Sequence, residues 1–308
     1  MNPKKNQTCN NIMGVCGLDP TESSSNHSTK PIEIYAFIDP LCPECWSFEP
    51  IIKKLKIEYG PYFRIRILLA GGIKAWNSCQ DPKKVQERKA QLSNFWNMVA
   101  SKSGMCCDGD FWLEQNQWDS PYLASLAIKA AELQGPQAGA KFLRKLREKL
   151  FLEKKDVTNS YILKECSQDA DLDVEEFIKD LYSDSAKQAL SCDMISTSEM
   201  NVDSTPTFVF FNDNVEEDGI KISGSYAYDI YVQILTEMLG FIPKKAPKMS
   251  IEQFIQKYEF VATVEIAVVF DLTTDEVEKT LKQLVLQQKV EKVSVKHGMF
   301  WRYIPTDS

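Results

Sequence analysis

The sequence predicts an α/β fold built around one parallel strand–helix–strand unit, and three observations support this prediction. A β-branched and aromatic run at residues 34–38 is followed by Asp39 and Pro40, which end a buried strand. Apolar residues at helical spacing follow from residue 46 to residue 55. A second apolar run occupies residues 62–69. Two strands joined by a helix in this order are expected to be parallel, with a right-handed crossover.

The motif Cys42-Pro43-Glu44-Cys45 lies where the helix of this unit is expected to begin. Pro43 suits the first helical position, where the missing N–H costs nothing, and Trp46 then opens the apolar face of the helix. A thiol at this end faces unpaired N–H groups and the positive end of the helix dipole, which favour the thiolate. The pattern therefore predicts a thioredoxin-type redox motif.

Within this motif, Cys42 is expected to be the exposed nucleophile and Cys45 the buried resolving thiol. The anionic side chain of Glu44 is expected to raise the pKa of the Cys42 thiol, which would make the motif a weaker oxidant. Half of a zinc site is the alternative interpretation, but no second CxxC follows along the chain.

Composition limits the classes of function. The chain has 308 residues, of which 44% are hydrophobic, so we expect one large domain and a smaller one. A net charge of −7 argues against nucleic acid as the main partner. No stretch approaches the roughly 18 apolar residues of a membrane span, and the first residues lack an apolar signal core. Nine cysteines in such a chain suit a reducing cytosol, so we expect a soluble cytoplasmic protein with no membrane partner.

Residues 1–30 are expected to form a flexible tail, because polar residues dominate them and their apolar residues show no period. Cys9, Cys16 and His27 lie in this stretch, but their spacing matches no standard zinc pattern. Solvated, reduced thiols are the preferred interpretation. We therefore expect neither a metal nor a cofactor.

Residues from about 81 to 200 are predicted to be helical. One helix is expected to be capped by Ser120 and stopped by Gly135, and another to follow Asp173. Adjacent cysteines rarely reach disulfide geometry, so Cys106 and Cys107 are expected to be reduced thiols in a loop rather than a redox pair. Core aromatic residues of this block are expected at Trp96, Trp112 and Trp118.

Strands are predicted again at residues 205–211 and 220–224, followed by a helix over residues 228–239. Pro206 heads the first of these strands, some distance after the CxxC motif. The Thr205–Pro206 bond is therefore the candidate for a cis peptide that holds a backbone edge beside Cys42. An ordinary trans-proline at the start of a strand is the alternative.

A Pro- and Lys-rich linker precedes a last unit over residues 248–308. A helix capped by Ser250, a second helix over residues 261–272 and a third helix with a Thr273 capping box are expected, followed by a hairpin at His297-Gly298. Three helices and a hairpin form a winged-helix-like unit. Its third helix opens with acidic residues, which favours contact with protein over contact with DNA.

The predicted order of elements resembles a DsbA-like thioredoxin fold over residues 31–241, with a helical insertion at about 81–200. The whole chain resembles the YjbH/SpxH proteins of Gram-positive bacteria in the segments DPLCPECW and LLAGGIKAWN, in lacking a signal peptide and in its C-terminal extension. This resemblance implies an adaptor that binds the transcription factor Spx and promotes its degradation by the ClpXP protease in disulfide-stress control. Some members have a histidine-rich, metal-binding N-terminus, whereas here His27 is the only histidine before His297.

A second class of function stays open, because both cysteines and the proline are present. The chain could be a cytosolic DsbA-type thiol-disulfide oxidoreductase that uses Cys42 and Cys45. Glu44, the reducing compartment and the additional C-terminal unit favour the adaptor. A glutathione-dependent isomerase of the same superfamily is less compatible, because such a protein would normally lack the cysteine at position 45.

Overall fold

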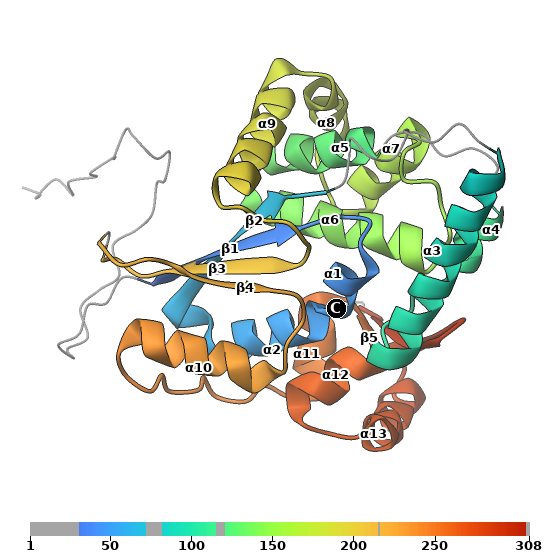
Figure 1. The fold of residues 1–308 in the computed structure, drawn as a ribbon. Helices are drawn as coiled ribbons and strands as arrows, with labels where there is room; N and C mark the ends of the chain where they lie inside the picture. The colour runs from blue at the N-terminus through green and yellow to red at the C-terminus, as the bar shows by residue number, and fades with distance from the viewer. Residues whose placement is uncertain (1–30, 72–81, 115–120, 215, 306–308) are drawn as a thin grey trace, which may run out of the picture.

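The computed structural model describes residues 31–71, 82–114, 121–214 and 216–305 (Figure 1). A four-stranded sheet in the order β2-β1-β3-β4 forms its centre. β1 and β2 are parallel, with Ile34 opposite Ile65, whereas β3 and β4 are antiparallel to their neighbours, so the predicted parallel unit is confirmed. The bounds are β1 Ile32–Ile38, β2 Phe63–Leu69, β3 Thr207–Phe211 and β4 Ile220–Ser223.

The crossover between β1 and β2 contains two helices where the sequence predicted one. α1 (Pro43–Ser47) and α2 (Glu49–Tyr59) are separated at Phe48, and a short 3₁₀ turn, Gly60–Tyr62, leads into β2. Pro50 explains the break, because it has no N–H to donate to the carbonyl of Trp46. α2 and α10 (Tyr228–Leu239) cover one face of the sheet, and α9 (Asp184–Glu199) lies on the other (Figure 1).

Among the described residues between β2 and β3, seven helices form the predicted insertion. α8 begins after Asp173, as expected, and the Asp173 side chain caps it by accepting a hydrogen bond from the N–H of Glu176. Trp96 and Trp112 are buried, which confirms their placement in the core. Trp118 and the expected Ser120 cap lie outside the described residues. The bounds are α3 Pro82–Ser103, α4 Asp110–Glu114, α5 Tyr122–Leu133, α6 Pro136–Phe151, α7 Ser160–Asp169, α8 Val174–Leu181 and α9 Asp184–Glu199.

The C-terminal elements follow the prediction with one correction. The Ser250 and Thr273 capping boxes and the hairpin are present. The continuous helix expected over residues 261–272 is wrong, because its first residues form a strand that pairs with the hairpin and places Val261 opposite Trp301. Long-range pairing has overridden the local pattern here. The bounds are α11 Ile251–Tyr258, β5 Phe260–Ala262, α12 Thr263–Phe270, α13 Thr274–Leu286, β6 Val290–Val295 and β7 Gly298–Tyr303.

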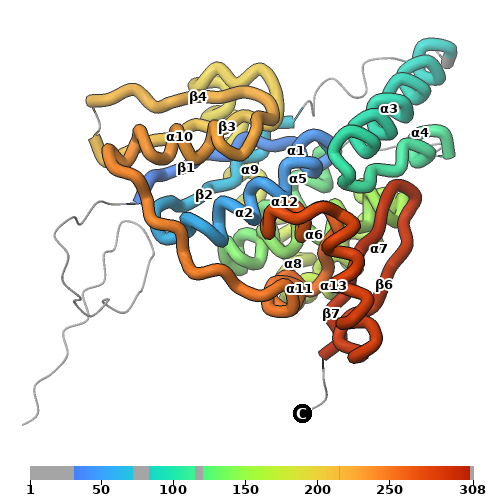
Figure 2. The backbone as a smooth tube through the Cα atoms, turned by 90° about the horizontal axis from the view of Figure 1, so that it is seen from below, coloured from blue at the N-terminus to red at the C-terminus, as the bar shows by residue number. Residues whose placement is uncertain are grey.

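The three-stranded C-terminal sheet, ordered β5-β7-β6, has a different core against each face. Val261 and Trp301 point into a cluster formed with α11, α12 and α13. Phe260 and Phe300 belong instead to the main core, which also contains Trp46. In Figure 2, α12 lies beside α2. The C-terminal elements therefore pack directly against the part of the chain that carries the CxxC motif.

No helix in the described part of the chain is long and apolar enough to cross a membrane. The stretch expected to be a tail, residues 1–30 with Cys9, Cys16 and His27, lies outside the described residues, as does most of the segment GGIKAWN.

Candidate functional site

Cys42 is the N-cap residue of α1, and Pro43 is the first residue of that helix, as the sequence predicted. The side chain of Asp39 shapes the preceding turn by accepting a hydrogen bond from the N–H of Leu41 at 2.8 Å. Cys42 is half-buried and Cys45 is buried, and both thiols are free. The motif therefore presents one accessible sulfur at the start of a helix and keeps the other inside.

The two thiols differ in acidity. Hydrogen bonding from Cys45 lowers the pKa of Cys42, and this effect outweighs burial and the Asp39 carboxylate, which act in the opposite direction. Burial raises the pKa of Cys45 well above its usual range, and the neighbouring Cys42 adds to the rise. Cys42 is thus the thiol that ionises more readily, and Cys45 is the thiol that keeps its proton. The carboxylate that raises the pKa of Cys42 is that of Asp39, whereas Glu44, to which the sequence assigned this effect, is exposed.

The loop before β3 lies against Cys42. The Thr205–Pro206 peptide bond is cis, as expected, and the Cys42 thiol donates to the carbonyl oxygen of Thr205 over 3.8 Å. The carbonyl of Pro206 accepts a hydrogen bond of 2.7 Å from Gly224. A cavity of about 260 Å³ extends from this loop between the end of β2 and α9. The structure thus places the CxxC motif and the proline loop side by side, as the sequence predicted.

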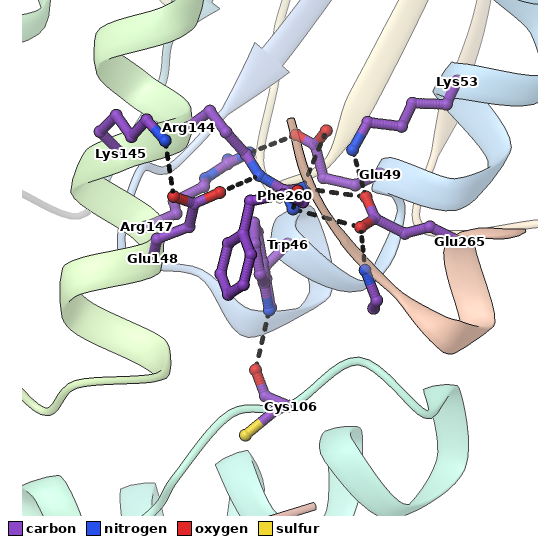
Figure 3. Close-up of polar contacts among 11 residues, drawn as sticks. Trp46, Glu49, Lys53, Cys106, Arg144, Lys145, Arg147, Glu148, Phe260 and Glu265 are labelled. Atoms are coloured by element: carbon purple, nitrogen blue, oxygen red, sulfur yellow. Dashed lines mark hydrogen bonds and ion pairs between the residues drawn. The ribbon is translucent and has the colours of Figure 1, made fainter. Parts of the chain in front are cut away.

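Trp46, the residue after Cys45, is buried and held on two sides (Figure 3). Its indole Nε1 donates a 2.8 Å hydrogen bond to the carbonyl oxygen of Cys106. The guanidinium carbon of Arg144 lies 4.5 Å from the ring centroid, and Phe151 stacks at 5.7 Å. Arg144 thus makes a cation–π contact inside the protein, where such contacts are strongest.

A buried ionic cluster joins three parts of the chain beside Trp46 (Figure 3). Glu265 of α12 accepts hydrogen bonds from both terminal nitrogens of Arg144 in α6, at 2.9 and 3.1 Å, and pairs with Lys53 of α2. The Glu265 carboxylate also accepts a 2.7 Å hydrogen bond from the backbone N–H of Ala262. Burial acts to raise the pKa of Glu265, but Arg144 and Lys53 hold this pKa at about 2. This carboxylate is therefore ionised in the folded protein.

The cluster continues towards the CxxC motif. Glu49 accepts a 3.0 Å hydrogen bond from Arg147, whose other nitrogens reach the carbonyl oxygens of Asp39 and Pro40 at 3.4 Å. Sequence reasoning missed these residues. A signal was present, since Glu265 is the only charged residue in the apolar stretch from 260 to 270. A buried charge needs a partner, so an isolated glutamate in such a run points to a buried ion pair.

The tip of the C-terminal hairpin forms a second contact between the C-terminal elements and the region around the CxxC motif. Lys296 bridges Asp108 at 2.8 Å and Asp110 at 2.6 Å, and Nε2 of His297 lies 3.1 Å from the side-chain oxygen of Asn97. Asp108 follows the loop residues Cys106 and Cys107, which are buried free thiols, in agreement with the prediction. Burial raises the pKa of both thiols, so they are poor nucleophiles.

No group of three or more histidine, cysteine and acidic residues within the described ranges could hold a metal ion. The Cys9, Cys16 and His27 set lies outside these ranges. The chemistry available at the site is that of one activated thiol, one buried thiol and the backbone edge at Thr205.

Fold and site together define a thioredoxin-like protein with a DsbA-like helical insertion. A family profile described as thioredoxin matches residues 35–233. A putative protein disulfide isomerase from Nitrosomonas europaea aligns with a TM-score of 0.57 at 21% identity, over 68% of this chain and 97% of its own. A probable DsbA oxidoreductase from Streptomyces coelicolor aligns with a TM-score of 0.53 at 16% identity, over 71% and 94%. Identities this low establish the fold alone.

Sequence relatives cover the C-terminal elements as well. The ClpXP adapter protein SpxH of Halalkalibacterium halodurans is 58% identical over 97% of this chain and 98% of its own length. The protein of the same name from Bacillus subtilis is 50% identical over 92% of both chains. The chain belongs to the SpxH family of ClpXP adapter proteins, which confirms the resemblance drawn from the sequence.

Proposed function

We propose that this chain is an adaptor that binds the transcription factor Spx and promotes its degradation by ClpXP. The observation that carries the proposal is the 58% identity to a ClpXP adapter protein SpxH over nearly the full length of both chains. The match includes the C-terminal elements, which disulfide chemistry does not need. The proposal places the chain in the cytoplasm, in the control of oxidative and disulfide stress.

In this proposal, two units of the chain share the adaptor function. Residues 31–241 form the DsbA-like unit, and residues 248–308 form a winged-helix-like unit that contacts protein. The acidic start of α13 supports this assignment, because Asp275 and Glu276 are exposed where a DNA-reading helix would present cations. The adaptor would therefore have protein partners, with neither nucleic acid nor a membrane among them.

The site of Cys42, Cys45, Thr205 and Pro206 serves in this proposal as part of a docking scaffold. The backbone edge at Thr205 can pair with an extended segment of a partner, while the buried ionic cluster fixes the C-terminal unit relative to that edge. Two separate surfaces in one rigid arrangement suit a protein that must hold a substrate and a protease together.

The specific observation that favours an oxidoreductase as the second candidate is the lowered pKa of Cys42 beside a buried Cys45. In that reaction the Cys42 thiolate attacks a substrate disulfide, forming a mixed disulfide and releasing one substrate thiolate. Cys45 then loses its proton and attacks Cys42, which releases the second substrate thiolate and leaves a Cys42–Cys45 disulfide.

A reconstituted degradation assay distinguishes the two functions. Spx, ClpXP and ATP are incubated in excess reductant with and without this protein, and the loss of Spx is followed over time. Faster loss with the protein present is the expected result. Unchanged loss, together with turnover of a model disulfide substrate, would replace the adaptor with the oxidoreductase.

A further inference from the structure

A second cavity, of about 350 Å³, shares no lining residue with the cavity beside Thr205. The apolar face of the central sheet forms its floor, α2 and α6 form its walls, and the end of α11 borders its mouth. Cys45 of the redox motif and Pro206 are also among its lining residues. Its volume falls within the range of small-molecule sites, which are mostly apolar with a few polar groups.

The floor has apolar side chains whose burial is incomplete. Ile65 and Ile67 of β2 face the cavity and are only half-buried, while the alternate residues Arg64 and Arg66 point to the opposite face and are exposed. Ile52 of α2 is also half-buried and lines the same space. Covering these branched side chains with an apolar group would remove their remaining surface from water, which is favourable in proportion to the area covered.

The charge around this cavity is opposite in sign to that of the chain. Seven lysines and arginines line it against five aspartates and glutamates, whereas the whole chain has a net charge of −7. Several of the lining carboxylates are already paired, among them Glu49 with Arg147 and Asp171 with Lys141. Among the described residues, Lys56 and Lys257 have no carboxylate within ion-pair distance, and both are exposed.

We propose that this cavity binds a small amphipathic carboxylate of the fatty-acid type. The acyl chain would lie on Ile65, Ile67 and Ile52, and the carboxylate would face Lys56 and Lys257 at the mouth. A cationic rim around an apolar interior is complementary to that combination of chain and charge. Because α11 belongs to the C-terminal elements, the bound ligand would join them to the central sheet and stabilise the folded chain.

Isothermal titration of the full-length chain with sodium decanoate tests this proposal. We expect saturable binding of one decanoate per chain, and binding at least tenfold weaker for decylamine, which has the same apolar chain with the opposite charge. Absence of saturable binding, or equal affinity for the two compounds, would overturn the proposal. Binding of an apolar peptide amide in place of decanoate would also overturn it and assign the cavity to a protein partner.

Two variants of the cavity, compared with one control, test where the ligand binds. Ala140 is exposed on α6 and lines the cavity, so Ala140→Trp should fill the mouth without disturbing the core and should abolish binding. Ala90→Trp, at an exposed position of α3, is the matched control and should bind as the unchanged chain does. Lys56→Glu combined with Lys257→Glu should weaken decanoate binding at least tenfold. Unchanged binding in either cavity variant would refute this site. The proposal does not depend on the adaptor role.

Discussion

The guanidinium of Arg144 lies over the indole of Trp46, with 4.5 Å between its carbon and the ring centroid. Trp46 directly follows Cys45, and Arg144 also binds Glu265 of the C-terminal elements and the carbonyl oxygen of Phe260 at 3.0 Å. One arginine of the helical insertion therefore contacts both the helix of the CxxC motif and the C-terminal elements. The contact couples the position of α12 to that of α1, although more than 200 residues separate them in the sequence.

Replacing Glu265 by glutamine should strongly destabilise the protein. The substitution leaves the buried Lys53 and the half-buried Arg144 with one carboxylate fewer, and breaking a buried ion pair typically costs about 3–5 kcal/mol. We expect a loss of this size in the free energy of unfolding measured with urea. Glu259→Gln is the control, because Glu259 is exposed and should change stability by less than about 0.5 kcal/mol. Equal stability of the two variants would contradict the central place given to Glu265.

The same carboxylate predicts a dependence of stability on pH. The pKa of Glu265 is held at about 2 in the folded chain, below the ordinary value of about 4.3 for glutamate. Such a group contributes stability that is fully present above the unfolded pKa and is lost as the pH falls through the folded pKa. The difference in unfolding free energy between the unchanged chain and Glu265→Gln should therefore shrink as the pH falls from about 5 to about 2. A difference that stays constant over this range would contradict the assignment.

The local features of the site were predictable because each depends on neighbours in the sequence. Pro43 at the start of a helix, Cys42 before it and a proline at the head of a strand follow from rules that span a few residues. The Thr273 capping box is of the same kind. These features could therefore be assigned to the correct residues, and they lie where the sequence placed them.

The missed features depend on contacts between distant segments. β5 forms because Val261 pairs with a strand near the C-terminus, and nothing in its local pattern indicates that partner. The effect assigned to Glu44 belongs to Asp39, because the helix turns Glu44 towards solvent while the strand end directs Asp39 at the turn before Cys42. The partners of Glu265 come from α2 and α6, and only the folded chain identifies them.

Cys42 should react faster than Cys45 with iodoacetamide, and its reactivity should depend on Cys45. Hydrogen bonding from Cys45 is the main cause of the lowered pKa of Cys42, so Cys45→Ala should move the alkylation midpoint of Cys42 to higher pH. Mass spectrometry of protein alkylated at a series of pH values measures the alkylation midpoint of each thiol. The exposed Cys192 serves as an internal control, since its labelling should be unaffected by Cys45→Ala. An unchanged Cys42 midpoint would contradict the role given to Cys45.

Gly109 should not tolerate alanine. A Cβ atom at this position would lie 2.2 Å from the backbone oxygen of Ser93, and the N–H of Gly109 bonds to Asn97 at 3.2 Å. Gly109→Ala must push the loop of Cys106 away from α3, and overpacking of this kind costs about 1–3 kcal/mol. At Gly60 a Cβ would meet nothing within 4 Å, so Gly60→Ala is the matched control and should be neutral or slightly stabilising. Urea unfolding compares the pair, and equal effects would contradict this packing.

Replacing both Cys42 and Cys45 by alanine should spare the delivery of Spx to ClpXP. In the proposed adaptor role the motif is part of a scaffold. Trp46 and the buried ionic cluster hold α1 against the rest of the chain, and they remain when the long contact between the Cys42 thiol and Thr205 is removed. The rate of Spx loss in the reconstituted assay should stay within about twofold of that with the unchanged chain, a difference of about 0.4 kcal/mol in activation free energy. The same preparation should show no turnover of a disulfide substrate, which verifies that the thiol chemistry has been removed. Loss of delivery in this double variant, with its urea midpoint unchanged, would mean that the thiols themselves act in the adaptor.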